Sequence, residues 1–220
     1  MNYWENIYKK KKQLVEWPFS ELISLFNRFK IKKKKKITRV LELGCGSGAN
    51  AIFFLSKKIS YTGIDFSKSV IKECEKKFYK RKNIKFYCMD ISKPLKFVKK
   101  FDYIIDRGSL THLSEKEIKN CVKNIYVNLR SKGIFFSIDL FSTNHSIFRK
   151  GKVYESYYTR IFKKKSDRYY NVGKISFFSK KKINNLFKRF QIIELIEKNL
   201  INYSKKSEKY SFWQMVLKKK

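Results

Sequence analysis

The stretch VLELGCGSGAN, residues 40–50, decides the fold. An apolar run ends close to Glu42, and Gly44, Gly46 and Gly48 then alternate with other residues before a helix-like segment begins. Glycine lets a backbone turn sharply and lets another group approach the main chain without meeting a side chain. The free N–H groups at the start of a helix can then bind a polar ligand. The stretch therefore predicts a buried strand, a ligand-binding turn and a helix.

Strand-like and helix-like segments alternate beyond this turn. The strand-like segments are near-continuous apolar runs, which is typical of strands covered on both faces; they are residues 38–44, 60–65, 84–90, 101–106 and 133–141. The helix-like segments between them are residues 49–57, 67–80 and 115–129. Ser67 and Ser114 are expected to cap two of these helices, and Gly133 to end the third in a left-handed conformation. Repeated strand–helix–strand units predict a doubly wound, mostly parallel α/β sheet.

The two ends of the chain have a different character. Residues 142–178 are rich in Tyr and Arg and show no clear period. A helix at 180–189 and two strands at 191–197 and 210–218 follow, and alternation in the last predicts an antiparallel strand. Before residue 38 we expect an aromatic-rich segment, an amphipathic helix over 20–29 and a solvated linker at the lysine run 32–36. The sequence thus predicts seven strands in one domain, 38–220, preceded by a helical segment, 1–37.

The net charge is extreme, because 53 Lys and Arg against 18 Asp and Glu give +35. Such a charge attracts polyanions, nucleic acid among them. The lysines are nevertheless spread over the N-terminal helix, most loops and the terminal KKK, and they do not gather in one segment of the sequence. This distribution favours a compositional bias, and a preference for anionic partners stays open as the alternative.

Cysteine usage and hydropathy indicate the compartment. Cys45, Cys74, Cys88 and Cys121 stand singly, without a CxxC pair or a histidine at metal-ligand spacing, so we expect reduced packing thiols and no metal. The N-terminus lacks an apolar signal region, and no run of about 18 apolar residues occurs. We therefore expect a cytoplasmic protein that does not enter a membrane.

Carboxylates are expected at the ends of three successive strands. They are Glu42, Asp65 and Asp90. Open α/β sheets bind ligands outside the carboxyl ends of their strands, and an acid that follows the second strand can accept hydrogen bonds from ribose hydroxyls. Helix capping would explain any one of these acids. Together with the glycine turn, the set favours a nucleoside-containing ligand.

This constellation resembles the class I S-adenosylmethionine-dependent methyltransferases. The matching segments are ELGCGSG (42–48), GID (63–65), CMD (88–90), FDYIID (101–106) and SKGIFFSID (131–139). The resemblance covers about residues 38–141, and the closing helix and strands are consistent with it. It implies a Rossmann-like fold with an antiparallel last strand and S-adenosyl-L-methionine as cofactor. The spacing GxGxG, in place of GxGxxG, separates the chain from dinucleotide-dependent oxidoreductases.

The resemblance also implies a role for each motif residue. The residues expected at the cofactor are Glu42, Gly44, Gly46, Gly48, Asp65, Phe66, Met89, Asp90, Ile91 and Asp106. Within this set, the glycine turn would surround the methionine and ribose, and Asp65 would hold the ribose hydroxyls. Asp90 would contact the adenine amino group.

The stretch IIDRGSLTHL, residues 104–113, is expected to face the methyl acceptor. A general base helps methyl transfer to a hydroxyl, and the candidates are Asp106 and His112, with His145 and tyrosines of 142–178 behind them. Asp106 either contacts cofactor or substrate or holds the following loop. His112 either acts in catalysis or caps and packs the next helix.

The acceptor class is narrowed by motifs that are absent and by two weaker resemblances. No Asn/Asp-Pro-Pro-Tyr follows the fourth strand, a motif that would indicate amino methylation of adenine or glutamine. No cysteine stands there either, as it would in methyltransferases that attack pyrimidine C5 covalently. DRGSL is similar to segments of small-molecule methyltransferases and loosely to DKGTL of some protein-lysine methyltransferases. YWENIYKKKKQLVEWPFSEL is similar to bacterial methyltransferases of glycan biosynthesis. We expect a small-molecule acceptor, a sugar or nucleotide-sugar, with 142–178 and the N-terminal aromatics as a lid; the alternatives are RNA, protein lysine, or cofactor binding without transfer.

Overall fold

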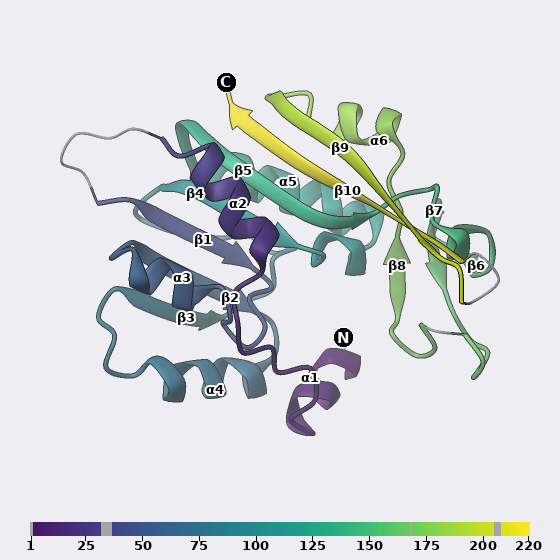
Figure 1. Ribbon diagram of the computed structural model, residues 1–220, viewed down its shortest axis with the longest axis horizontal. Coiled ribbons are helices and arrows are strands. Elements are labelled where there is room, and N and C mark those ends of the chain that lie inside the picture. The colour runs from purple at the N-terminus through teal and green to yellow at the C-terminus, as the bar shows by residue number, and fades with distance from the viewer. Residues whose placement is uncertain (1, 32–36, 168, 205–207) are drawn as a thin grey trace.

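A seven-stranded sheet forms the centre of the molecule (Figure 1). The computed structural model describes residues 2–31, 37–167, 169–204 and 208–220, so the expected linker at 32–36 lies outside the described residues. In sheet order the strands are β3 (Ile84–Cys88), β2 (Ser60–Asp65), β1 (Arg39–Leu43), β4 (Phe101–Arg107), β5 (Leu129–Phe141), β10 (Glu208–Lys219) and β9 (Phe190–Asn202). The first five pair in parallel, and β10 is antiparallel to both of its neighbours. The predicted doubly wound sheet with an antiparallel last strand is confirmed.

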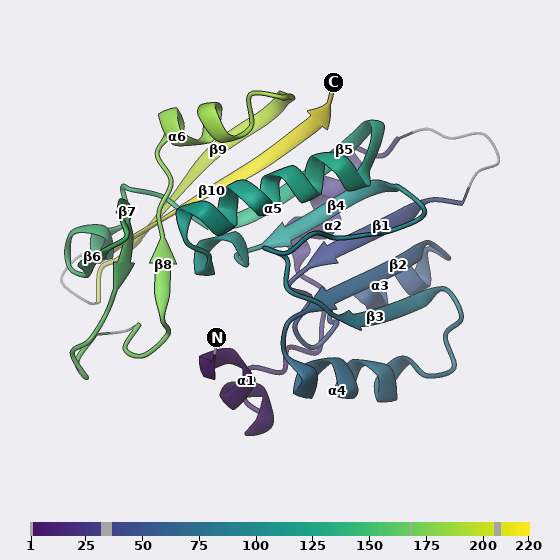
Figure 2. The ribbon, with the colours of Figure 1, turned by 180° about the vertical axis from the view of Figure 1, so that it is seen from behind.

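Helices cover both faces of this sheet (Figure 1, Figure 2). One face packs against α2 (Ser20–Arg28), α3 (Ala51–Ser56) and α4 (Lys68–Phe78), and the other against α5 (Glu115–Asn128) and α6 (Lys180–Leu186). Two predicted N-caps are confirmed, since Ser67 accepts a hydrogen bond from the backbone of Val70 and Ser114 forms a capping box with Glu117. Burial on both faces explains why the strands are continuous apolar runs.

The turn after α5 differs from the prediction. The chain passes from α5 directly into β5, and Lys132, with φ 60°, takes the left-handed conformation that we expected at Gly133. The reason for a glycine at this position is space. A Cβ on Gly133 would lie 2.8 Å from Cγ of Leu129 and 3.0 Å from the carbonyl oxygen of Asp102.

A small second sheet lies beside the end of β9 and the start of β10 (Figure 1). Its antiparallel strands are β6 (Lys152–Tyr154), β7 (Ser156–Ile161) and β8 (Lys174–Ser176), preceded by the 3-10 turn η2 (Ser146–Arg149). The sequence predicts no regular structure here, because strands this short do not display an alternating pattern. At the other end of the chain, α1 (Asn2–Lys9) packs beside α4.

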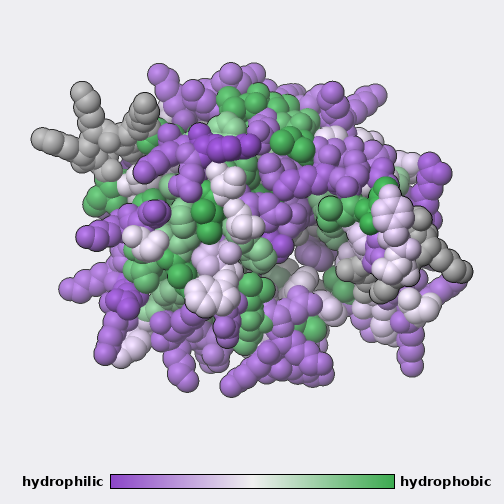
Figure 3. Space-filling view, in the orientation of Figure 1, coloured by the Kyte–Doolittle hydropathy of each residue, from purple (hydrophilic) through white to green (hydrophobic). Residues whose placement is uncertain are grey.

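The surface reflects the composition of the chain. Hydrophilic side chains are scattered across the whole face seen in Figure 3, with apolar side chains between them. All four cysteines are free thiols; Cys45, Cys74 and Cys121 are buried, and Cys88 is exposed. None of the helices in the described part of the chain combines the length and apolar character needed to cross a bilayer.

Candidate active site

A cavity of about 740 Å³ lies at the carboxyl ends of the parallel strands. Its walls come from the glycine turn after β1, the ends of β2 and β3, and the loop after β4. The N-terminal segment, the loop before β8 and the strands β9 and β10 complete it. The predicted motif residues that line this cavity are Glu42, Gly44, Gly46, Asp65, Phe66, Met89, Asp90, Ile91 and His112. Gly48 and Asp106 do not belong to the lining.

The glycine turn is held in a conformation that other residues rarely adopt. Gly44, Gly46 and Gly48 have φ values of 62°, 51° and 70°. A Cβ on Gly44 would lie 2.0 Å from Oγ of Ser109, so the loop after β4 packs directly on this turn. A Cβ on Gly48 would lie 2.9 Å from the ring of Phe86, which makes this glycine a packing contact between the turn and β3.

Glu42 is a buried carboxyl group at the end of β1. It accepts a hydrogen bond from Nδ2 of Asn50 at 2.7 Å and another from the hydroxyl of Tyr61. Burial raises its pKa to about 7, and the two hydrogen bonds oppose that shift. Glu42 therefore fixes Asn50, which also accepts a hydrogen bond from the backbone of Phe19 at 3.0 Å.

Asp65 and Asp90 bring two more carboxylates to the same cavity. Asp65 accepts hydrogen bonds from the backbone N–H groups of Gly46 at 3.1 Å and Ser67 at 3.0 Å, and burial raises its pKa. Asp90 accepts from the backbone and the hydroxyl of Ser92 through one carboxylate oxygen. Because a carboxylate has about four acceptor positions, both side chains retain capacity for ligand hydroxyl or amino groups. These acceptors, with apolar Met89 beside them, fit the ribose and adenine of S-adenosylmethionine.

Asp106 lies beneath the cavity wall. One carboxylate oxygen accepts hydrogen bonds from the backbone N–H groups of Ser109 at 3.0 Å and Leu110 at 3.1 Å, and the other accepts from the Ser137 hydroxyl at 3.0 Å. Burial raises its pKa to about 7. This geometry corresponds to the second alternative, in which Asp106 holds the loop that follows β4.

His112 lines the cavity in the loop that follows β4. It belongs to the 3-10 turn η1 (Leu110–His112) and precedes the cap of α5, whereas the sequence places it at the start of that helix. Its ring centroid is 5.1 Å from that of Trp4. Among the described residues, none forms a hydrogen bond with its buried Nδ1 atom. Burial lowers its pKa to about 4, so the imidazole is neutral at pH 7.

Three ion pairs involve cationic side chains of the cavity lining. Nη2 of Arg107 lies 2.9 Å from a carboxylate oxygen of Asp139, and its guanidinium stacks over the ring of Phe19 at 3.5 Å. The other two pairs are Lys174 with Glu117, and Lys198 with Glu21 at 3.7 Å. The cations that line the cavity in the described part of the chain are therefore each paired with a carboxylate.

The N-terminal helix closes one side of the cavity, which the sequence alone did not reveal in detail. Glu5 accepts hydrogen bonds from the hydroxyls of Ser67 at 2.5 Å and Ser69 at 2.6 Å, at the start of α4. The Tyr8 hydroxyl lies 3.1 Å from the position of a Cβ on Gly46. The helix thus spans the cavity from the α4 terminus to His112.

The fold agrees with comparisons to known proteins. Residues 40–133 match a family model described as a methyltransferase domain. Over 137 residues the chain is 31% identical to phosphoethanolamine N-methyltransferase 3 of Arabidopsis thaliana, which covers 57% of this chain but only 27% of that protein. The chain thus spans about a quarter of the length of this relative.

Solved structures share the whole fold at low sequence identity. A methyltransferase from Methanosarcina mazei superposes with a TM-score of 0.72 at 17% identity, covering 92% of this chain and 98% of that one. An N1-methyltransferase from Burkholderia thailandensis, solved with 1,6-didemethyltoxoflavin and S-adenosylhomocysteine, has a TM-score of 0.59 at 18% identity, covering 84% and 72%. The methyltransferase-domain match over residues 40–133, together with the strand order shared with these structures, supports a class I S-adenosylmethionine-dependent methyltransferase with the Rossmann-like fold.

Proposed function

We propose that the protein transfers a methyl group from S-adenosylmethionine to a small-molecule acceptor, a sugar or nucleotide-linked sugar. One observation carries this proposal. A single cavity of about 740 Å³ joins the glycine turn and the strand-end carboxylates to an aromatic end that contains His112. A cavity of this size can enclose a small ligand beside a cofactor.

The cofactor end is assigned to the residues of the first three strand ends. In this arrangement Asp65 accepts hydrogen bonds from the ribose hydroxyls, Asp90 accepts from the adenine amino group, and Met89 and Ile91 lie beside the ring. The turn of Gly44 to Gly48 faces the methionine part, with Gly48 in a packing role. When bound, S-adenosylmethionine supplies a sulfonium methyl group that is already electrophilic.

The acceptor end is assigned to the loop after β4. His112 is the proposed general base, because a neutral imidazole has one ring nitrogen that can accept the proton of an acceptor hydroxyl. Asp106 is a positioning residue in this proposal, since its hydrogen bonds to Ser109 and Leu110 fix the loop that carries His112.

Two segments are proposed as covers that exclude water during transfer. Residues 1–37 contribute α1, whose Trp4 contacts His112 and whose Glu5 binds the start of α4. Residues 142–178 contribute Tyr169 and the loop before β8 to the lining. Alignment of the acceptor in a closed site supplies much of the rate acceleration of such reactions.

The alternative acceptor is RNA or a protein lysine, which the net charge of +35 favours. The paired cations of the cavity weigh against an RNA phosphate inside it, because that group would meet Arg107, Lys174 and Lys198 already bound to carboxylates. The same pairing weighs against the phosphates of a nucleotide-linked sugar, so a sugar without phosphate fits this part of the proposal better.

The test uses methyl-labelled S-adenosylmethionine with the full chain and a cell extract. The reaction is fractionated by size with and without nuclease and protease. Label in the low-mass fraction before either enzyme is added supports the proposal. Label that moves to low mass only after nuclease or protease treatment supports the macromolecular alternative and contradicts the small-molecule proposal.

A further inference from the structure

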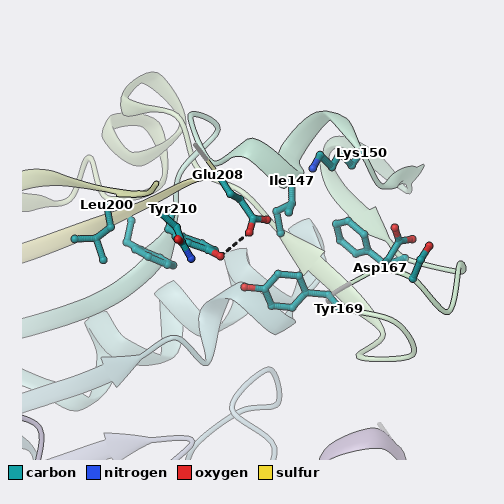
Figure 4. A pocket seen from close by; sticks show the side chains of 11 residues that line it. Ile147, Lys150, Asp167, Tyr169, Leu200, Glu208 and Tyr210 are labelled. Atoms are coloured by element: carbon teal, nitrogen blue, oxygen red, sulfur yellow. Dashed lines mark hydrogen bonds between the residues drawn. The ribbon is translucent and has the colours of Figure 1, made fainter. Parts of the chain in front are cut away.

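A second cavity of about 710 Å³ lies between the small sheet and the turn end of the β9–β10 hairpin (Figure 4). It is bordered by η2, by the segment that follows β7, and by the facing ends of β9 and β10. None of the methyltransferase motif residues takes part in its lining. Its volume is similar to that of the first cavity, so it can hold a group as large as a small ligand.

The two cavities share a wall. Tyr169, Leu200 and Phe212 line both of them. Leu200 comes from β9, Phe212 from β10, and Tyr169 from the segment between β7 and β8. The second cavity therefore adjoins the first at these three side chains, and a molecule that occupies both must pass between them.

The second cavity combines aromatic rings with hydrogen-bonding groups. Phe162, Tyr169 and Tyr210 supply apolar ring surfaces, and Asp167, Asn202 and Glu208 supply carboxylate and amide groups. In Figure 4 the Tyr210 hydroxyl donates to Glu208 at 2.5 Å, with Tyr169 on the opposite wall. Ring faces pack against C–H surfaces, while carboxylates accept hydrogen bonds from hydroxyl groups.

This combination suits a polyhydroxylated ring. A sugar has an apolar C–H face for the aromatic side chains and a rim of hydroxyl donors for the acids. A phosphate group is less suited, because the lining contains two carboxylates and the single cation Lys150 among its described residues.

We infer that the second cavity binds a glycosyl unit at the far end of the methyl acceptor. The inference rests on the proposed function and deepens it: the acceptor is an elongated glycoside, whose methylated group lies beside His112 and whose distal sugar lies between Tyr169 and Glu208. Leu200, which lines both cavities, then contacts the acceptor between its methylated group and its distal sugar.

The test compares two neighbouring residues of β9. Leu200 and Ile201 are both exposed, at 61% and 48%, but Leu200 lines both cavities and Ile201 lines neither. Leu200→Trp should narrow the passage without unfolding the strand, and Ile201→Trp is the matched control. Both variants receive labelled S-adenosylmethionine and the low-mass fraction of a cell extract, and initial rates of label transfer are measured.

We expect Leu200→Trp to lower the transfer rate at least tenfold, with Ile201→Trp within twofold of the wild type and cofactor affinity equal in all three. Glu208→Gln, which keeps an oxygen acceptor for Tyr210, should also lower the rate at limiting extract and recover at high extract. Acid hydrolysis of the labelled product should release a monosaccharide.

The outcomes separate this inference from the proposed function. Transfer by the wild type to a low-mass product, with Leu200→Trp as fast as Ile201→Trp, overturns the distal site and leaves the proposed function standing. A product without a sugar overturns the glycosyl assignment. Absence of any low-mass labelled product overturns the proposed function and this inference with it.

Discussion

Replacing Asp106 by asparagine should remove a buried charge and keep the hydrogen bonds of the loop after β4. The asparagine oxygen can accept from the backbone of Ser109 and Leu110, and its amide can donate to Ser137, because a hydroxyl group serves as donor or acceptor. The variant therefore tests whether burial of this carboxyl group sets the pH dependence of stability.

The magnitude follows from the pKa of Asp106, which burial raises from 3.8 to about 7. A carboxyl group with a raised native pKa holds its proton longer in the folded state, so its contribution to stability falls as pH rises from the unfolded pKa through the native one. The free energy of unfolding falls by about 1.4 kcal/mol for each pH unit in that window. Between pH 5 and pH 8 the wild type should lose about 3 kcal/mol that Asp106→Asn does not lose.

The assay is urea unfolding followed by tryptophan fluorescence at both pH values. Glu42 titrates in the same window because its pKa is also about 7. The charge of Asp106 helps to raise the pKa of Glu42, so the substitution lowers that pKa and increases the difference between the two proteins in the same direction. Glu75→Gln, at an exposed carboxyl group on α4, is the control and should leave the pH profile unchanged. If Asp106→Asn follows the wild-type profile, or is less stable at pH 8, the reasoning about the buried carboxyl is wrong.

Three further substitutions, with Gly173→Ala as a control for one of them, test other parts of the site. Asp65→Ala should weaken binding of S-adenosylmethionine by about 1–3 kcal/mol, measured by calorimetry, through loss of charge-assisted hydrogen bonds; unchanged affinity would remove Asp65 from the cofactor site. His112→Ala should lower turnover by about a hundredfold with little effect on cofactor affinity. The turnover of the wild type should show no step from protonation of His112 above about pH 5, because burial lowers the pKa of this imidazole to about 4. Gly44→Ala should destabilise the chain by about 3 kcal/mol or more in urea unfolding, because its Cβ would lie 2.0 Å from Oγ of Ser109. Gly173→Ala, where φ is also positive but no described atom lies within 4 Å of the Cβ, should cost about 1 kcal/mol, and equal losses would contradict the steric account.

The meeting of the glycine turn with the strand-end carboxylates in one cavity was predictable because its signals are local. The glycine turn directly follows β1, and Asp65 and Asp90 stand at or just beyond the ends of their strands. Parallel strands bring those ends to one edge of the sheet, so position along each strand suffices to bring the acids together. The position of Asp106 near the end of β4 did not show that its side chain lies outside the cavity lining, because position along a strand does not tell which side of the sheet a side chain faces.

The surroundings of His112 were less predictable because their contacts join distant segments. Trp4 meets His112, and Phe212 of the last strand forms a wall with Tyr169. No spacing in the sequence links these residues. The short strands β6 to β8 likewise depend on pairing with one another, and Lys132 adopts a left-handed conformation that composition alone would assign to a glycine.

Equilibrium titration of S-adenosylmethionine into the full chain tests the central claim most directly. The account predicts saturable one-site binding, competition by S-adenosylhomocysteine, and weaker binding of both by Asp65→Ala than by the exposed-site variant Glu75→Ala. The absence of saturable binding, or equal affinity in these two variants, would contradict the assignment of the cavity at the strand ends as the cofactor site.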